Sequence, residues 1–384
     1  MSVEDKKNKQ DPRKLLALDG GGIRGVMALE VLAKIESELQ TTLKRSNDFI
    51  LADYFDYIAG TSTGAIIAAC LSLGMRVAEI TKFYVDSGPA MFDKANLLDR
   101  YYRNKFHDEK LKATLRKVIQ DKTGDADTTL GSDALKTYLL LVLRNATTDS
   151  PWPLSNNPAA KYNDRELGDC NLHLPLWQLI RASTAAPTYF PPEVITFGTG
   201  EKAYEFVFVD GGVTMYNNPA FHLFLMATLG QYKLGWPAGE DKMLLVSIGT
   251  GAAAKANKNL QPDEMNLIYN ASSIPSALMF AASNEQDLLC RVFGKCLNGG
   301  LLDLEVMDLI GPIGKGPVSP KLFTYMRYNA DLSRKGLDEL GLPHIKPENV
   351  QQQLDSTAHI KEIQEVGQAV AKEVNIEHFR EFLN

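Results

Sequence analysis

A short apolar strand followed at once by a glycine-rich turn and an apolar helix occurs twice near the start of the chain. The first unit has its strand at residues 15–18 and its helix at 28–39, where apolar residues recur at helical spacing. The second unit has a strand at 55–59, a turn at 60–64 and a helix at 65–73. Strands that alternate with helices in this way predict a three-layer α/β fold, in which helices cover both faces of a mostly parallel sheet.

Later segments extend the same plan. Apolar runs at 138–144, 206–209 and 243–248 predict further buried strands, and residues 323–329 are interpreted as a late or edge strand. Apolar residues at helical spacing between 360 and 374 predict an amphipathic helix near the end of the chain.

The domain organisation follows from length and continuity. A chain of 384 residues suits one large or two ordinary domains, and no repeat, low-complexity tract or clear linker divides it. We therefore expect one structural domain, made of a core over residues 14–260 and a mainly helical extension over 261–384 that packs on this core.

Composition excludes several classes of function. The net charge of −6 gives no basic footprint, so no nucleic-acid partner is expected. The four cysteines form no C-x-x-C pair and no cluster at zinc spacing, which predicts free buried thiols, a reducing compartment and no metal or cofactor. Residues 1–14 lack the apolar segment of a signal peptide, and no stretch reaches the roughly 18 apolar residues that span a bilayer. We expect a cytoplasmic protein that touches membrane only peripherally.

The second turn carries the pattern G-x-S-x-G, formed by Gly60, Ser62 and Gly64. Between a strand and a helix, such a sharp turn lifts the serine oxygen out of the sheet, and the flanking glycines avoid side-chain clashes. The N-terminus of the helix adds free N–H groups and positive potential. The pattern therefore predicts a nucleophilic serine; the alternative is a glycine-rich turn with a structural role only.

The first turn, Asp19–Gly25, matches G-x-G-x-x-G through Gly20, Gly22 and Gly25. That match suggests dinucleotide binding, which needs a second strand that ends in an acidic residue about 20 positions on. Asp48 lies near that distance, but polar residues rather than a strand precede it. Consecutive glycine N–H groups can instead hold a developing oxyanion. A tight turn that only packs the first helix is the remaining alternative.

A third motif, Asp210-Gly211-Gly212, follows the expected strand at 206–209. A carboxylate at the carboxyl end of a strand lies where open α/β sheets place their sites. Taken alone the motif is weak, because most such pairs are turns.

Taken together, the three motifs make the chain resemble the patatin-like phospholipase family. The resemblance also includes residues 181–190 and 247–251, and it spans roughly residues 14–251. It implies the three-layer patatin-like fold and a serine lipid acyl hydrolase of phospholipase A type.

The resemblance also implies a role for each motif residue. Ser62 would be the nucleophile and Asp210 the general base of a Ser–Asp dyad, acting through an acyl-enzyme. The oxyanion hole would be formed by the loop that carries Gly20, Gly21, Gly22 and Arg24, with the N–H of Thr63 as a further donor. The supporting glycines of the two other motifs are Gly60, Gly64, Gly211 and Gly212.

Several alternatives stay open. A Ser-Asp-His triad in that chain order would need a late histidine, either His344 or His359, whereas His222 is interpreted as a packed or capping residue. The same dyad could serve a general esterase or thioesterase. The third class is a non-catalytic module that binds lipid or nucleotide.

The substrate is expected to be membrane phospholipid. Apolar residues at 89–92 and 187–192 are candidates for an acyl-chain trough, and the basic segment 100–117 is a candidate for anionic headgroups or a nucleotide phosphate. Some bacterial members of the family degrade membrane phospholipid in anti-phage defence only after a cyclic dinucleotide binds. This part of the resemblance suggests a cyclic dinucleotide activator, and a homo-oligomer is a further expectation.

Overall fold

The computed structural model describes most of the chain. Its described residues are 3, 6, 9, 12–92, 100–187, 190–253, 267–302, 317–351 and 358–383; side chains are described for all of these except 89–92, 100–108, 267–273, 275 and 276.

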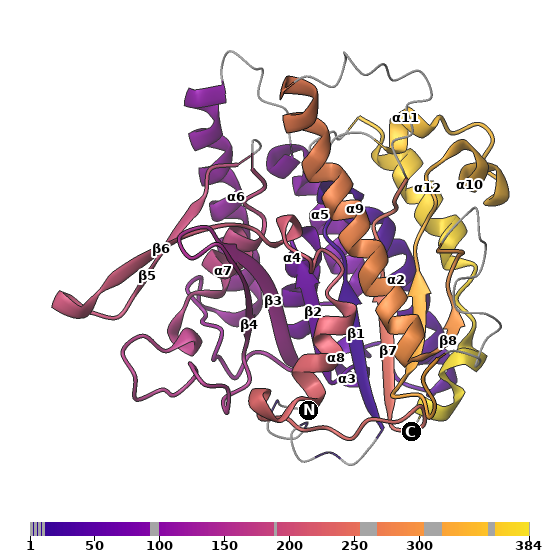
Figure 1. Ribbon diagram of the computed structural model, residues 1–384, viewed down its shortest axis with the longest axis horizontal. Helices are drawn as coiled ribbons and strands as arrows, with labels where there is room; N and C mark the ends of the chain where they lie inside the picture. The colour runs from indigo at the N-terminus through magenta and orange to yellow at the C-terminus, as the bar shows by residue number, and fades with distance from the viewer. Residues whose placement is uncertain are drawn as a thin grey trace.

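Nine strands of the described chain form one sheet, which is the middle layer of the molecule (Figure 1). Its order is β5-β6-β3-β2-β1-β7-β9-β8, and β4 pairs with β3. The pairings from β3 through β2, β1, β7 and β9 to β8 are parallel, whereas β4, β5 and β6 pair antiparallel. The strands are β1 Arg13–Leu18, β2 Tyr57–Thr61, β3 Tyr138–Asn145, β4 Ser150–Ser155, β5 Glu193–Phe197, β6 Tyr204–Asp210, β7 Met243–Ile248, β8 Lys295–Asn298 and β9 Thr324–Tyr328.

The central strands are buried along their whole length, as expected for parallel strands covered on both faces. Leu16 and Leu18 of β1 face one core, whereas Leu15 and Ala17 face the other. Helices α2, α4, α5, α6, α7 and α12 contribute to the first core, and α8 and α9 to the second. In Figure 1, α8 and α9 are drawn in front of the central strands. The fold is therefore the three-layer α/β arrangement predicted from the sequence.

The helices alternate with the strands along the chain. Short 3-10 turns complete the connections, including η1 at Gly22–Arg24 and η4 at Gly211–Val213. The α-helices are α2 Gly25–Thr42, α3 Leu51–Tyr54, α4 Thr63–Ser72, α5 Val77–Phe92, α6 Arg100–Thr123, α7 Leu176–Ser183, α8 Ala220–Thr228, α9 Leu267–Phe293, α10 Arg334–Glu339, α11 Pro347–Val350 and α12 Ile360–Ala371. Within the described part of the chain, none of these helices is both long and apolar enough to cross a bilayer.

Two strands, β2 and β6, pair with the same edge of β3, and this arrangement positions the candidate site. Residues 138–142 pair with β2, and residues 143–145 pair with β6. Strand β4 pairs with residues 140–145 and so lies on the other edge. The carboxyl ends of β2 and β6 therefore meet beside the middle of β3, where Thr61 pairs with Val142 and Asp210 with Leu143.

Three features differ from the sequence predictions. Strand β9 lies between β7 and β8 and is therefore not at the edge of the sheet. Strand β5 was not expected, and β6 runs antiparallel in a hairpin with it that projects from the body of the molecule (Figure 1). Beyond residue 260 the chain supplies β8, which was not expected, in addition to the expected strand β9 and the helices.

Candidate active site

Ser62 occupies the single residue between the end of β2 and the start of α4. Its φ of 54° and ψ of −123° are unusual for a residue with a side chain, so the backbone is strained at this point. The turn is also crowded, since a Cβ on Gly60 would lie 2.1 Å from the Gly64 carbonyl oxygen, and one on Gly64 would lie 2.3 Å from that of Leu18. Only glycine fits these two positions, which explains the G-x-S-x-G pattern.

The Ser62 hydroxyl donates a hydrogen bond of 2.6 Å to Oδ2 of Asp210. The other carboxylate oxygen, Oδ1, accepts the N–H of Gly212 at 2.6 Å. Both Ser62 and Asp210 are buried. The Ser62 N–H donates to Ser183 Oγ at 2.9 Å, and this contact fixes the backbone of the turn against α7. The structure thus brings together the two residues predicted as a dyad.

Burial raises the pKa of Asp210 to about 6, although hydrogen bonds from Ser62 and Gly212 and the charge of Arg181 act in the opposite direction. An aspartate at its ordinary pKa, near 4, is a poor base at neutral pH. A pKa nearer the working pH improves proton transfer. The carboxylate is still ionised at pH 7, so it can accept the proton of the Ser62 hydroxyl.

The described histidine side chains make no hydrogen bond with Ser62 or Asp210. His344 Nε2 pairs with Glu365 at 2.9 Å, and His359 Nδ1 pairs with Glu362 at 3.0 Å. His222 is buried and stacks on Tyr216 with ring centroids 4.2 Å apart, which agrees with the prediction of a packed residue. The geometry therefore gives no support to a triad.

The glycine loop lies directly against the serine, because a Cβ on Gly20 would be 3.2 Å from the Cβ of Ser62. The Gly20 N–H donates to the carbonyl oxygen of Asn217 at 3.0 Å, and the Gly20 carbonyl accepts from Thr250 Oγ1 at 2.7 Å. Gly20 is therefore an anchor of the loop and has no N–H free for an oxyanion, unlike the predicted role. Within the described chain, the N–H groups of Gly21 and Gly22 have no acceptor.

Two other predicted members of the oxyanion hole lie at helix starts. Thr63 is the first residue of α4, and its N–H has no acceptor within the described chain. Its hydroxyl is 2.7 Å from that of the buried Tyr84. Arg24 ends η1, caps the start of α2 and is half-buried; burial lowers its pKa to about 10, so it stays cationic at neutral pH. No hydrogen bond between its guanidinium and Ser62 or Asp210 occurs among the described residues.

Residues far along the chain, which sequence reasoning missed, also hold the site. Asn217 anchors the loop through its carbonyl, and its side-chain Nδ2 donates to Ser283 Oγ of α9 at 3.1 Å. Arg327 of β9 forms an ion pair with Asp19, the residue that opens the loop. Thr250 belongs to a segment included in the resemblance, but neither Asn217 nor Arg327 has a spacing that would have identified it.

An apolar side chain of α9 lies close to the site. A Cβ on Gly212 would lie 3.2 Å from the terminal methyl of Met279, so α9 passes close to the motif that carries Asp210. Its neighbour Leu278 is 65% exposed, and Met215, three residues after Gly212, is 50% exposed. The predicted apolar candidates at 89–92 and at 188–189 lie outside the described side chains.

The basic segment 100–117 has described side chains only from residue 109 onward. Lys112 lies 3.3 Å from a carboxylate oxygen of Glu193, and Arg116 lies 2.7 Å from one of Asp127. These two cations are paired within the protein, whereas Lys110 and Lys117 of the same segment are exposed.

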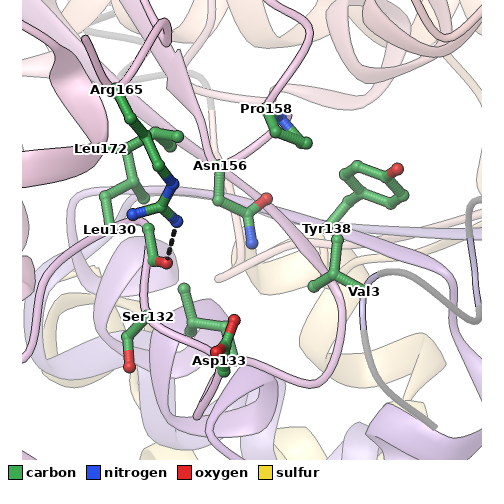
Figure 2. A pocket seen from close by; sticks show the side chains of 11 residues that line it. Val3, Leu130, Ser132, Asp133, Tyr138, Asn156, Pro158, Arg165 and Leu172 are labelled. Carbon is green, nitrogen blue, oxygen red and sulfur yellow. Dashed lines mark hydrogen bonds between the residues drawn. The ribbon is translucent and has the colours of Figure 1, made fainter.

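A cavity of ≈ 400 Å³ lies at the opposite end of the sheet. Tyr138, at the start of β3, lines it, as does Asn156, which follows β4 (Figure 2). In this view Arg165 reaches back to the Gly131 carbonyl, to which its Nη2 donates at 2.6 Å. The cavity contains none of the candidate catalytic residues, so we do not assign it to the active site.

A strand-to-helix turn that presents a serine to an aspartate defines an α/β protein of the serine hydrolase type. Residues 16–224 match the family model of the patatin-like phospholipases. The chain is 30% identical over 352 residues to Patatin-17 of Solanum cardiophyllum and 28% identical over 345 residues to Patatin-04/09 of Solanum tuberosum. Each alignment covers 79% of this chain and 84% of the relative.

The chain belongs to the patatin-like phospholipase family, and it is a lipid acyl hydrolase that acts on carboxylic esters. Among solved structures, VipD from Legionella pneumophila aligns with a TM-score of 0.39 and 13% identity, over 94% of this chain and 66% of that one. A similarity at this level adds nothing to the family assignment.

Proposed function

We propose that this protein cleaves fatty acyl esters of membrane phospholipids through a Ser62–Asp210 dyad and an acyl-enzyme. The observation that carries the proposal is the 2.6 Å hydrogen bond from the Ser62 hydroxyl to the buried Asp210 carboxylate, at a strained strand-to-helix turn. Strain of this kind is concentrated at functional sites.

In the first half-reaction, Ser62 Oγ attacks the ester carbonyl carbon while its proton passes to Asp210 Oδ2. The carbonyl oxygen becomes negative and is stabilised by the free N–H groups of Gly21, Gly22 and Thr63, aided by the dipole of α4. Arg24 adds positive charge to the loop. The ester C–O bond then breaks, and Asp210 returns the proton to the departing alcohol of the lysophospholipid.

The second half-reaction releases the fatty acid. A water molecule gives a proton to Asp210 as its oxygen attacks the acyl-enzyme carbonyl, and the same donors hold the second oxyanion. The C–O bond to Ser62 breaks, and the proton held by Asp210 returns to the serine oxygen. Each residue therefore ends the cycle in its starting protonation state.

The surroundings of the dyad support a lipid substrate. Met279 of α9 lies beside Gly212, and the exposed Met215 and Leu278 are near these two residues in the sequence. Flexible apolar side chains adapt to irregular surfaces such as acyl chains. Peripheral contact of this face with a membrane would bring the ester carbonyl to Ser62.

The pH dependence of hydrolysis tests the base. Asp210 accepts a proton only when ionised, and its pKa is about 6, so kcat/KM on a soluble short-chain ester is expected to be flat above about pH 7 and to fall below pH 6. The decrease should approach tenfold per pH unit. Activity that stays constant down to pH 4.5 would contradict the role of Asp210.

Regulation by a cyclic dinucleotide, in anti-phage defence, is part of the same proposal and rests on the family resemblance. The direct experiment measures fatty acid release from long-chain phospholipid vesicles and turnover of short-chain esters and thioesters, each with and without a panel of cyclic dinucleotides. We expect phospholipid hydrolysis that increases when a nucleotide is present. Equal rates with and without nucleotide would contradict the regulation alone, and turnover of short-chain substrates only would favour a general esterase or thioesterase. No turnover of any substrate would favour a binding module.

A further inference from the structure

Asp19 and Arg327 form an ion pair that is almost fully buried, with side-chain exposures of 6% and 5%. Nη1 of Arg327 donates to Asp19 Oδ1 at 2.8 Å, and Nη2 donates to Oδ2 at 2.5 Å. The two residues are separated by 308 positions in the sequence. Two parallel hydrogen bonds between a guanidinium and a carboxylate fix orientation as well as distance.

The register of the sheet explains how the pair forms. Ser247 of β7 pairs with Ala17 of β1 on one side and with Arg327 of β9 on the other. Asp19 lies two residues beyond Ala17, so its side chain is expected to leave the sheet on the same face. Arg327 reaches across β7 to it and also donates to Ser247 Oγ at 2.7 Å.

Two further charged groups on this face, Asp287 and Arg291 of α9, are paired with each other. Asp287 of α9 accepts two hydrogen bonds from Arg291, at 3.0 and 2.9 Å, and one from the Tyr325 hydroxyl at 3.0 Å. Arg327 is thus left to neutralise Asp19. Burial raises the pKa of Asp19, and the charge and hydrogen bonds of Arg327 act against this increase.

Stability alone does not account for such a pair. A buried ion pair can often be replaced by apolar residues without loss of stability, because desolvation offsets the attraction between the charges. What the pair does provide is a fixed position for Asp19, whose N–H also donates to the carbonyl oxygen of Ile248 at 3.0 Å. Asp19 leads directly into Gly20, which is held by Asn217 and Thr250.

We propose that Arg327 is a positioning residue for hydrolysis, which through Asp19 holds the glycine loop so that the N–H groups of Gly21 and Gly22 face the carbonyl attacked by Ser62. The inference rests on the proposed function of the dyad. Arg327 lies beyond residues 16–224, the segment that matches the family model. The C-terminal part of the chain would therefore complete the active site without touching the substrate.

The test compares Arg327→Met, Arg327→Lys and Asp19→Asn with a matched control, Asp56→Asn. Asp56 is also buried and ion-paired, with Lys9 at 2.8 Å, but it precedes β2 at the opposite end of the sheet. For each variant, Tm is measured together with kcat and KM on a soluble ester. A lost oxyanion donor typically lowers kcat by about 10²–10³-fold, and we expect about 10²-fold for Arg327→Met with KM within about threefold.

Arg327→Lys should recover part of kcat, because it restores the charge but not the two-point contact. Asp56→Asn should lower Tm and leave kcat within about threefold of the wild type, since it leaves the loop intact. If Arg327→Met does not fold, the double variant Asp19→Asn/Arg327→Met removes both charges; it should regain Tm but not kcat.

The variants of Arg327 and Asp19 are assayed well below their Tm. The inference is overturned if their kcat falls by no larger a factor, relative to the wild type, than the kcat of Asp56→Asn. Failure of the proposed function has a different signature, which is ester hydrolysis that survives Ser62→Ala in an otherwise unchanged protein. The two failures are therefore distinguishable within one set of assays.

Discussion

Replacing Ser62 by alanine is expected to abolish hydrolysis of phospholipid and of soluble esters, with kcat reduced by at least ~10⁴-fold. Loss of a serine nucleophile in a well-characterised protease costs about 2 × 10⁶-fold, and residual turnover comes from binding and the oxyanion hole. The variant loses only the hydroxyl that donates to Asp210 and keeps the Cβ of residue 62, so folding should be preserved. The measurement is fatty acid release together with the thermal unfolding curve.

Ser72→Ala is the matched control for this prediction. Ser72 ends the helix that Ser62 precedes, is fully buried, and has its hydroxyl 2.8 Å from that of Thr137. We expect this variant to lose a hydrogen bond worth about 1 kcal/mol and to retain hydrolysis. Activity retained by Ser62→Ala would show that another group is the nucleophile.

Asp210→Asn is expected to reduce kcat by about 10⁴-fold, the size of effect seen when an aspartate is replaced in a protease triad. The amide keeps the shape of the carboxylate and can still accept the N–H of Gly212, but it cannot take the proton of Ser62. Activity close to that of the wild type would show that the base is a different residue.

The same variant should be more stable than the wild type at pH 7. The pKa of Asp210 is about 6 in the folded protein and near 4 when the chain is unfolded, so folding at pH 7 disfavours the charged carboxylate. Stability of the wild type therefore increases as the pH falls from about 6 toward 4. The difference in Tm between Asp210→Asn and wild type should be largest at pH 7 and smaller at pH 5. Asp56→Asn, which removes an ion-paired carboxylate, should change Tm in the opposite direction.

Much of the fold could be predicted because its signals are local. Strands β1, β2 and β7 are apolar runs that stop at glycines or polar residues, and the two strand–turn–helix units lie within short windows. Strand β5 was missed because only its alternate residues are buried, and its sequence, Glu-Val-Ile-Thr-Phe, mixes apolar and polar residues. The direction of β6 was not predictable either, since it depends on pairing with β3 and β5 rather than on its own residues.

Part of the candidate site could likewise be predicted from local motifs, and part of it could not. Ser62 and Asp210 were predicted from motifs, and the structure places their oxygens 2.6 Å apart. The glycine loop was predicted as a segment, but the use of the Gly20 N–H by Asn217 depends on a contact nearly 200 residues away in the sequence. Arg327 is farther still from its partner Asp19. No periodicity or spacing rule reports such contacts.

Because β2 and β6 pair with the same edge of β3, the proposed catalysis depends on how these strands are aligned. Ser62 and Asp210 are carried by different strands, and each strand takes its position from β3. A slip of β6 by one residue would move Asp210 by about 3.4 Å and turn its side chain to the other face of the sheet. Hydrolysis through Ser62 and Asp210 would therefore depend on correct pairing of β6 with β3, and molecules with a shifted β6 should be inactive.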